Sequence, residues 1–477
     1  MVWALDESGN FCRIAPRRLA RRNPRRMSRG RRIVSTPSQP ESVAPEPKKA
    51  MSLRGAVFLG VGAMVGAGIF ALLGEAGAVA GAAVWISFII AGIMSAALGY
   101  TLVKFGQRYP SSGGIIVYLL HGFQSRRLVG VAAWLGYLTA IVVVGAMVAI
   151  SFGDYAAAVF FRAPSGGMAS KLCAVALVIG ATVMSIAGPR VVDRIQSWIV
   201  WPLLLVFAVF IVATIGKLDL TLLSPSQYPS WAEIIASVAL TFFAFLGFAV
   251  ISFAAGDLAN PEREIPRAMY GALAITTVLY VLVALCVFGT LTVEDVVRFG
   301  PTAIAEAARP TLGDAGFALM AVAALLATAS SVTATLYASD GLTKTLAAER
   351  IFPRVFGADS RLGSHGGLLI TGVLSLLFVT VLGLGALASI GSAVSLAVFA
   401  LVAIGAFRLR KELQANAAIV ILAITIAGIV LIGFAVDLAR NDLRSLVIAV
   451  ALVILALVAQ LALEASQRRG SANATQG

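Results

Sequence analysis

The sequence predicts an all-α membrane protein, and composition, run length and residue pattern each support this fold class. Of the 477 residues, 59% are hydrophobic and 13% are charged, whereas soluble domains carry about 25% charged residues. Several separate apolar runs approach or exceed the roughly 20 residues that cross a hydrocarbon core of about 30 Å. Runs such as 317–328 lack the alternation of a barrel strand. A soluble protein is excluded, and a transmembrane barrel is disfavoured.

Twelve apolar stretches account for the predicted transmembrane helices, in order along the chain. The first six are centred in Val57–Val79, Trp85–Val103, Val129–Ile150, Leu172–Ile186, Ile199–Ile215 and Ile234–Phe253. The second six are centred in Tyr270–Leu291, Phe317–Leu336, Leu368–Leu387, Ile390–Phe407, Ala417–Val436 and Leu446–Leu463. Each is long and apolar enough to be read as a crossing.

The basic residues test this count, because they accumulate on the cytoplasmic side of membrane proteins. Twelve crossings with an internal N-terminus assign seven of the 37 basic residues to outer loops: Arg162, Lys171, Lys217, Arg298, Arg309, Arg440 and Arg444. The other thirty fall inside, and 13 of these belong to residues 1–54. We therefore expect both termini in the cytoplasm and the protein in the inner or plasma membrane.

The N-terminal segment is the most basic part of the chain. Residues 1–54 hold 13 basic residues and four acids, which is typical of a disordered tail that contacts anionic lipid headgroups. We expect a basic, disordered cytoplasmic tail over 1–50, a twelve-helix domain over 51–466 and a short cytoplasmic tail over 467–477. Met51 is an alternative start, so how much of the tail is made stays open.

Two of the twelve stretches are predicted to be broken helices. In the first, Gly60, Gly62, Gly66 and Gly68 fall within nine residues, and each glycine costs about 1 kcal/mol of helix preference relative to alanine. This spacing favours unwound backbone. Gly62 and Gly66 also form a GxxxG pattern, so plain helix packing is the alternative. The sixth stretch has a weaker counterpart, a single glycine among the phenylalanines of 242–249.

The two breaks lie five helices apart, which is the spacing of structural repeats with inverted topology, because five is odd. Repeat one covers about 52–216 and repeat two about 231–411, followed by two extra helices over about 416–464. Irregular backbone at membrane depth needs protein or a cavity to satisfy its N–H and C=O groups. We therefore expect the two breaks to face each other across a central site.

The broken backbone also predicts the chemistry of that site. The second half of the first helix begins near Gly68 and Ile69, where N–H groups at the positive end of a helix dipole suit a carboxylate. Unpaired carbonyls, which suit an ammonium group or a cation, are expected where the preceding half-helices end, around Ala63, Met64, Phe243, Ala244 and Leu246. Donors beside acceptors match a zwitterion, that is, an α-amino acid.

Four motifs occur in a fixed order along the chain. They are the glycine-rich segment Gly60–Phe70, the Arg-Tyr-Pro-Ser-Ser-Gly-Gly of 108–114, the phenylalanine-rich segment 242–248 and the segment 257–266, which runs from Asp-Leu-Ala-Asn-Pro to Ile-Pro. Together they resemble the amino acid, polyamine and organocation (APC) transporter superfamily, from about Ser52 to the last stretch. The resemblance implies the five-plus-five inverted repeat of leucine-type transporters, and alternating access in which helices 1, 2, 6 and 7 move against the others.

The resemblance also implies substrate-binding residues. The backbone-contacting positions of the family fall on Met64, Ala67, Gly68, Phe243, Ala244 and Leu246. The candidate substrate site adds the neighbouring Val65, Gly66 and Phe245. Phenylalanines 243, 245 and 248 either form an aromatic lid over the substrate or pack in the core. Groups that handle protons in some relatives are replaced here, at Lys104, Gly136, Leu203 and Ala249.

A sodium site is the candidate for ion coupling. Carbonyls of Gly62 and Val65, joined by hydroxyls of the eighth stretch, give the all-oxygen shell that a hard cation prefers. The candidate hydroxyls are those of Thr328, Ser330, Ser331 and Thr333, and we select Ser330 and Ser331. The alternative is that the serines and threonines of this stretch bond back to their own helix or join neighbouring helices. Proton coupling and exchange without a coupling ion stay open.

Acidic side chains are scarce near the middle of the predicted helices. Glu75 and Asp154 lie toward outer ends. Asp257 and Asp340 lie toward inner ends, where basic residues are available as partners: Arg190, Arg194 and Lys344. Without a fixed anion at the centre, a polyamine lacks a counter-charge. We therefore favour a neutral amino acid as substrate.

The sequence predicts an amino acid permease, a secondary transporter with an amino acid as its small-molecule substrate and the lipid bilayer as its surroundings. No catalytic residue, metal or cofactor is expected beyond a coupling H⁺ or Na⁺, because the three cysteines and two histidines form no cluster. Nucleic acid is not an expected partner. A polyamine or cationic amino acid carrier or exchanger, and a non-transporting substrate sensor, are the alternatives. The oligomeric state stays open.

Overall fold

The chain divides into two units, Met1–Lys48 and Lys49–Gly477. The computed structural model describes residues 3–5, 11–13, 52–110, 114–123, 125–186, 189–253, 258–357 and 362–474. In the first unit, strands β1 (Trp3–Leu5) and β2 (Phe11–Arg13) pair antiparallel, with Trp3 opposite Arg13. These six residues of the tail that we expect to be disordered therefore form regular structure. The rest of 1–50 lies outside the described residues.

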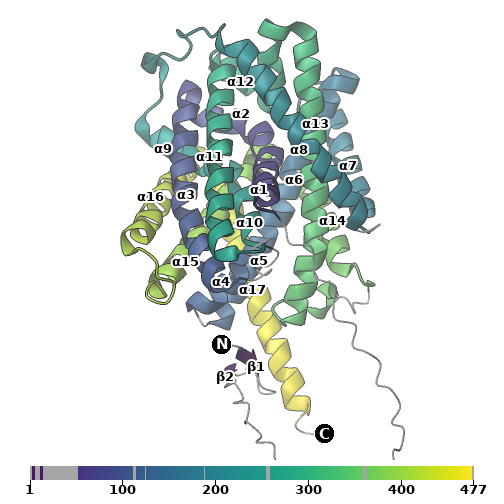
Figure 1. Cartoon of the computed structure of the whole chain (residues 1–477). Helices are drawn as coiled ribbons and strands as arrows, with labels where there is room; N and C mark the ends of the chain where they lie inside the picture. Colours follow the sequence, from purple (N-terminus) through teal and green to yellow (C-terminus); the bar gives the residue numbers. More distant parts are fainter. Residues whose placement is uncertain are drawn as a thin grey trace, which may run out of the picture. The chain divides into compact units, whose positions relative to one another are not determined.

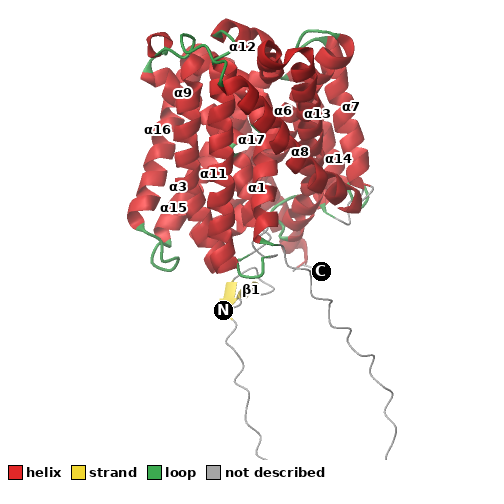
Figure 2. Ribbon diagram, turned by 45° about the horizontal axis from the view of Figure 1, so that its top comes forward, coloured by secondary structure: helices red, strands yellow, loops and turns green. Residues whose placement is uncertain are grey.

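The second unit consists of helices, with its loops at the two ends (Figures 1 and 2). Its first half contains α1 (Leu53–Ala67), α2 (Ile69–Ala80), α3 (Val84–Arg108), α4 (Gly114–Phe123), α5 (Arg126–Tyr137), α6 (Val144–Ala156), α7 (Met168–Ile186) and α8 (Pro189–Ile215). Its second half contains α9 (Trp231–Ala244), α10 (Val250–Phe253), α11 (Pro261–Phe288), α12 (Val293–Phe299), α13 (Ala303–Ala348), α14 (Gly366–Val381), α15 (Leu384–Arg408), α16 (Ala417–Asn441) and α17 (Leu443–Ala474). Within this unit α1 lies in the middle and packs against α11 and α13 (Figure 1).

Eight helical stretches among the described residues are long and apolar enough to cross a membrane, or nine if one bent pair counts as a crossing. These nine coincide with nine of the twelve predicted stretches. The fifth and ninth predicted stretches fall on shorter apolar helices, Ile199–Ile215 and Gly366–Val381, and the first is divided between the short helix Leu53–Gly66 and the beginning of the span Ile69–Arg108. The number twelve therefore stays a prediction.

The glycine-rich segment is mostly helical, so the prediction of an unwound stretch is wrong for its first three glycines. Helix α1 runs through Gly60, Gly62 and Gly66, and only Gly68 (φ −92°, ψ −69°) separates it from α2. Close packing is the physical reason: a Cβ at Gly62 would lie 2.7 Å from Cγ2 of Val200 on α8. These glycines bring α1 close to its neighbours, as in the packing alternative.

The sixth predicted stretch is broken, as the sequence indicates. Helix α9 ends at Ala244, a tighter 3₁₀ turn covers Leu246–Ala249, and α10 follows from Val250. The two parts, Trp231–Ala244 and Leu246–Ser252, are bent by 44°. The N–H of Phe245 donates to the carbonyl of Phe242, and the N–H of Phe248 donates to that of Phe245. These hydrogen bonds reach back three residues, as in a 3₁₀ turn, instead of the four of an α-helix.

Aromatic side chains fix the broken helix to three neighbouring helices. The ring of Phe245 lies 5.0 Å from that of Tyr280 on α11, which lies 5.3 Å from that of Phe88 on α3. The ring of Phe248 lies 5.2 Å from that of Phe399 on α15. All of these rings are buried. The break is therefore held by core packing that involves helices far apart in the sequence.

Two helix boundaries differ from the predictions. The ninth predicted stretch extends to Leu387, but α14 ends at Val381 and α15 already begins at Leu384. Helix α13 spans 46 residues, begins well before the eighth predicted stretch, and has a kink at Gly313 (φ +66°) just before that stretch. The boundary between α14 and α15 cannot be recognised from hydrophobicity, because apolar residues lie on both sides of the short connection. The kink in α13 occurs at a glycine with a positive φ angle.

The third predicted stretch contains one π-helical segment, Leu138–Val143, and a second, Ala157–Phe161, lies beyond its predicted end at Ile150. The first lies between α5 and α6, and the second follows α6 without a gap. A π turn contains one more residue than an α turn and is rare. No hydrophobic pattern distinguishes it from an α-helix, so the sequence gives no sign of it.

Candidate functional site

The interruption of the first stretch lies directly against that of the sixth. A Cβ at Gly68 would overlap the carbonyl oxygen of Ala244. In the reverse direction, a Cβ at Gly247 would lie 2.5 Å from both the carbonyl carbon of Ala63 and the nitrogen of Met64. Backbone meets backbone at both points, so each position accepts only glycine. The two breaks are therefore adjacent.

This contact places the start of one helix beside the end of another. The N–H of Gly68 donates to the carbonyl of Met64 at 2.8 Å and closes α1, while the N–H of Leu72 donates to the carbonyl of Gly68 at 2.9 Å in the first turn of α2. The N–H of Gly68 and the carbonyl of Met64 are thus both used within α1, which corrects their predicted roles as a free donor and an unpaired acceptor. The donors of α2 begin at Ile69, whereas the carbonyl of Ala244 ends α9.

One tyrosine, which the sequence motifs do not single out, joins the two breaks. The hydroxyl of Tyr280 donates to the carbonyl of Ala244 at 3.2 Å, and the N–H of Ile69 faces the same hydroxyl oxygen. That oxygen lies 2.6 Å from the position of a Cβ at Gly68. The sequence signal that could have identified it is a single tyrosine in the apolar run 271–289. A buried tyrosine hydroxyl usually has a hydrogen-bond partner, so such a residue indicates a polar group nearby.

The nine predicted substrate residues lie on both sides of this contact. Seven of them are buried: Met64, Val65, Gly66, Gly68, Phe243, Ala244 and Phe245. Leu246 is half-buried. The side chain of Ala67 lies outside the described residues. The fold brings the two groups together because α1 packs on the 3₁₀ turn Leu246–Ala249.

The phenylalanines near the sixth break have different surroundings. Phe245 and Phe248 pack against rings of other helices, as in the core interpretation. The ring of Phe243 instead lies against Gly391 of α15, where an added Cβ would overlap it. Phe243 is thus the one of the three whose ring is bounded by a glycine backbone. Gly391 is a second residue that the motifs do not reveal.

The candidate cation site falls where α1 packs against α13. A Cβ at Gly66 would lie 3.3 Å from the Cβ of Ser331, and Ser330 and Ser331 are both half-buried. The hydroxyls of Thr328 and Thr333 donate to carbonyls of their own helix at 2.6 and 2.8 Å. The hydroxyl protons of these two threonines are therefore used within α13. Ser330 and Ser331 remain as the candidate hydroxyl ligands for a cation.

A cavity of about 460 Å³ lies at the end of the helical unit that carries α12. Its lining includes the carboxylates of Glu75 and Asp154 and the basic side chains of Lys171 and Arg298. The Oδ1 atom of Asp154 accepts a hydrogen bond from the N–H of Gly166 at 2.7 Å. The two acids predicted near outer helix ends therefore share one cavity with charges of both signs.

An acidic residue near the C-terminal end of α13 is paired with a basic residue. The Oδ2 atom of Asp340 lies 2.7 Å from Nζ of Lys344 and 3.2 Å from Nδ1 of His365. The predicted pairing with Lys344 is present. The other predicted participants lie outside the described side chains: Arg190, Arg194 and Asp257.

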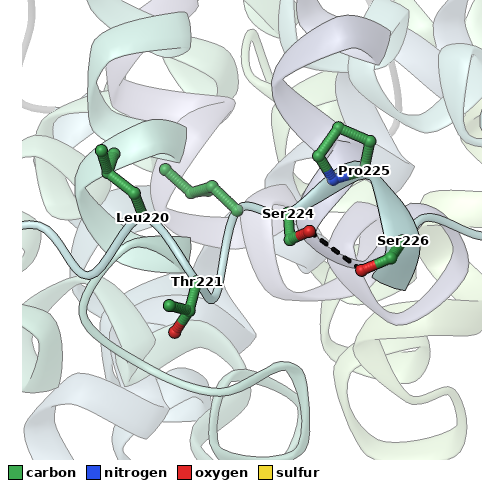
Figure 3. Close-up of a pocket in the computed structure, with 6 residues that line it drawn as sticks. Leu220, Thr221, Ser224, Pro225 and Ser226 are labelled. Carbon is green, nitrogen blue, oxygen red and sulfur yellow. Dashed lines mark hydrogen bonds between the residues drawn. The ribbon is translucent and has the colours of Figure 1, made fainter.

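A surface depression in the loop between α8 and α9 has a different character (Figure 3). It is lined by Leu220, Thr221, Leu223, Ser224, Pro225 and Ser226. The hydroxyl oxygens of Ser224 and Ser226 are 2.9 Å apart and hydrogen-bonded. Its lining carries hydroxyl groups and no charge, so it offers neither end of a zwitterion a partner. Among the described residues, no group of three or more His, Cys, Asp or Glu side chains is placed to hold a metal ion.

Apolar helices that enclose two adjacent breaks define an integral membrane protein of the transporter class. Residues 51–461 match the family model described as amino acid permease. The chain belongs to this family, which is part of the APC superfamily.

Several relatives carry names that describe transport. The chain is 32% identical to the inner membrane transport protein YbaT of Escherichia coli over 410 residues, which are 86% of this chain and 95% of that protein. It is 28% identical to the methylthioribose transporter of Bacillus subtilis over 398 residues, 80% of this chain and 84% of that protein. It is 28% identical to the serine/threonine exchanger SteT of the same organism over 280 residues, 58% of this chain and 63% of that protein.

Proposed function

We propose that the chain is a secondary active transporter that moves a neutral α-amino acid across the membrane by alternating access. One observation carries the proposal: the start of α2 at Ile69 and the end of α9 at Ala244 meet at Gly68. A substrate carboxylate would accept from the N–H groups of α2, and the ammonium group would donate to carbonyls of α1 and α9. Backbone groups would then bind the part that all α-amino acids share.

The absence of charge around the breaks favours a neutral substrate. Residues 62–69 and 242–249 contain no charged side chain. The second ammonium group of lysine, or the amines of a polyamine, would need a counter-charge inside the membrane. The buried Met64 and Phe243 present apolar surface instead.

The names of the relatives support a small solute as the substrate and add candidate substrates to be tested. SteT is named for serine and threonine, which are neutral amino acids. The other Bacillus subtilis relative is named for methylthioribose, which is not an amino acid. Serine and threonine are therefore the first substrates to test, and methylthioribose tests whether the site requires a zwitterion.

We propose that α1 with α2 forms the first of twelve crossings, and α9 with α10 the sixth, in a five-plus-five inverted repeat. Both termini would lie in the cytoplasm, and the membrane would be the inner or plasma membrane. Helices 1, 2, 6 and 7 would move as a group. Hydrogen bonds and ring contacts that connect Ile69, Phe88, Phe245 and Tyr280, one residue from each of these four helices, support this grouping.

Coupling to Na⁺ or H⁺ is part of the proposal. The candidate cation site consists of the carbonyls of Gly62 and Val65 and the hydroxyls of Ser330 and Ser331. Sodium-driven uptake should fall in a Ser330→Ala/Ser331→Ala double variant, while a Thr380→Ala variant, on an exposed part of α14, serves as the control. Uptake driven by a pH gradient alone would assign the coupling to H⁺.

Uptake of labelled serine and alanine into proteoliposomes tests the function. We expect saturable uptake that other neutral amino acids inhibit, and that lysine and putrescine do not. Inhibition by putrescine or lysine alone would identify a cationic carrier instead. Uptake only with amino acid inside the vesicles would identify an exchanger, and binding without uptake would identify a sensor.

A further inference from the structure

Tyr280 is held between two phenylalanine rings. Its ring centroid lies 5.3 Å from that of Phe88 on α3 and 5.0 Å from that of Phe245 at the sixth break, and the side chain is fully buried. Contacts with two aromatic neighbours restrict the ring. The position of the hydroxyl is therefore set by three helices together rather than by α11 alone.

The hydroxyl occupies the junction of the two breaks. It donates to the carbonyl of Ala244 at 3.2 Å, and the N–H of Ile69 faces it. Its oxygen also lies 2.6 Å from the position of a Cβ at Gly68. The glycine at 68 thus makes room for this hydroxyl as well as for the carbonyl of Ala244.

A hydroxyl suits both of these backbone groups. It carries one proton to donate and two lone pairs to accept, so it gives the Ala244 carbonyl a donor and the Ile69 N–H an acceptor. Backbone polar groups inside a membrane need such partners, because water is excluded. An α-amino acid would bring the same pair of functions, a donor in its ammonium group and an acceptor in its carboxylate.

We propose that the hydroxyl of Tyr280 is an internal substitute for the two charged ends of the substrate. An amino acid that binds at the junction displaces the hydroxyl from Ala244 and Ile69, and the hydroxyl returns when the amino acid leaves. This inference rests on the proposed function, because it assigns a competing group to the same site. Tyr280 is thus a positioning residue that keeps the two breaks together between substrates.

If the Tyr280 hydroxyl competes with the substrate in this way, the competition lowers the affinity for the substrate by a measurable amount. Substrate must exchange with hydrogen bonds that the protein already makes, so the observed affinity is lower than the junction would show without the hydroxyl. A residue that only supports the fold would lower stability when changed and leave the affinity alone. A residue that contacts the substrate would lower the affinity when changed. The three roles therefore differ in the direction of the effect.

Tyr280→Phe tests the inference, since it removes the hydroxyl and keeps the ring. The dissociation constant for serine and alanine is measured with the purified full-length protein, together with its melting temperature without amino acid. We expect the melting temperature to fall and the dissociation constant to decrease about two- to tenfold, the factor that corresponds to one net hydrogen bond.

Tyr137→Phe is the matched control. The hydroxyl of Tyr137 is also buried and makes one hydrogen bond, to Oγ1 of Thr371 at 2.8 Å, within a different hydrophobic cluster. This variant should lose a similar amount of stability and bind amino acids with the wild-type dissociation constant. The comparison separates loss of a buried hydrogen bond from loss of a competitor for substrate.

The outcomes divide clearly. If the wild-type protein binds no amino acid, the proposed function fails and the inference fails with it. If the wild type binds and Tyr280→Phe binds equally or more weakly, the inference alone is overturned. If Tyr280→Phe is not recovered, Phe88→Leu replaces it: removal of one ring that holds the tyrosine should also lower the dissociation constant, and an unchanged value would reject the inference.

Discussion

The ring of Phe243 on α9 lies against the α-carbon of Gly391 on α15, with no room for a methyl group between them. Phe243 immediately precedes Ala244, whose carbonyl ends α9. The position of the ring and the position of that carbonyl are therefore coupled through one peptide unit. Helix α15 thus acts on the proposed site through a residue that carries no side chain.

Gly391→Ala should disturb the site through this contact. The added methyl overlaps the ring, and overpacking of a well-packed core costs about 1–3 kcal/mol. We expect a lower melting temperature and a larger dissociation constant for the amino acid. Gly428→Ala on α16 is the control, because nothing lies within 4 Å of its added Cβ. Equal dissociation constants for the two variants would contradict a role of Gly391 at the site.

Gly68→Ala and Gly247→Ala should each abolish uptake, because the new Cβ meets backbone that cannot rotate away. Labelled amino acid uptake is measured at matched protein levels in the membrane. Gly271→Ala on α11, where the closest atom would be Cγ2 of Val57 at 3.6 Å, should transport normally. Wild-type uptake by either of the first two variants would show that substrate binds elsewhere.

Asp154→Ala should loosen the connection between α6 and α7. Its Oδ1 accepts hydrogen bonds from the N–H of Gly166 and the hydroxyl of the buried Ser170, and loss of the acceptor for a buried donor costs about 1–3 kcal/mol. We expect a lower melting temperature and faster proteolysis of the loop 162–167. Asp437 is half-buried, and its carboxylate bonds only to Asn441 among the described residues; Asp437→Ala should melt like the wild type.

The raised pKa of Tyr109 predicts that the free energy of unfolding changes with pH in the alkaline range. Burial, followed by its hydrogen bond to Glu412 at 2.8 Å, raises the pKa of Tyr109 from 10.0 to about 12. Below pH 10 the hydroxyl is neutral in the folded and the unfolded chain, and its full contribution to stability is present. Above pH 10 the unfolded chain ionises first, so the contribution is lost as pH rises toward 12.

The measurement is the difference in melting temperature between the wild type and Tyr109→Phe. The wild type should melt higher at pH 8, and its advantage should shrink steadily above pH 10. Because other tyrosines titrate in both proteins, the difference isolates Tyr109. A difference that stays constant up to pH 11.5 would contradict the predicted linkage.

The location of the breaks was predictable because it depends on local sequence. Clustered glycines and a glycine among phenylalanines both weaken a helix within one turn, and the structure interrupts the helices at Gly68 and Phe245. The extent of the first break was not predictable. Whether Gly62 unwinds a helix or packs it closely depends on Val200, a residue 138 positions away in the sequence.

The role of Tyr280 was hidden for the same reason. Its hydroxyl bonds to Ala244, 36 residues earlier, and faces Ile69 on another helix. Hydrophobic periodicity reports only which side of a helix is apolar. It does not report which backbone groups of other helices lack partners, and those groups determine where a buried hydroxyl is useful.

The π-helical segment Leu138–Val143 sets the rotation of α6 about the helix axis relative to α5. One extra residue in a turn rotates everything that follows by about 100° around the axis. On one side of the segment Tyr137 bonds to Thr371, and on the other Ser151 bonds to the carbonyl of Phe70. Deletion of one residue between them would turn one of these side chains away from its partner. This stretch should therefore accept substitutions more readily than a change in length.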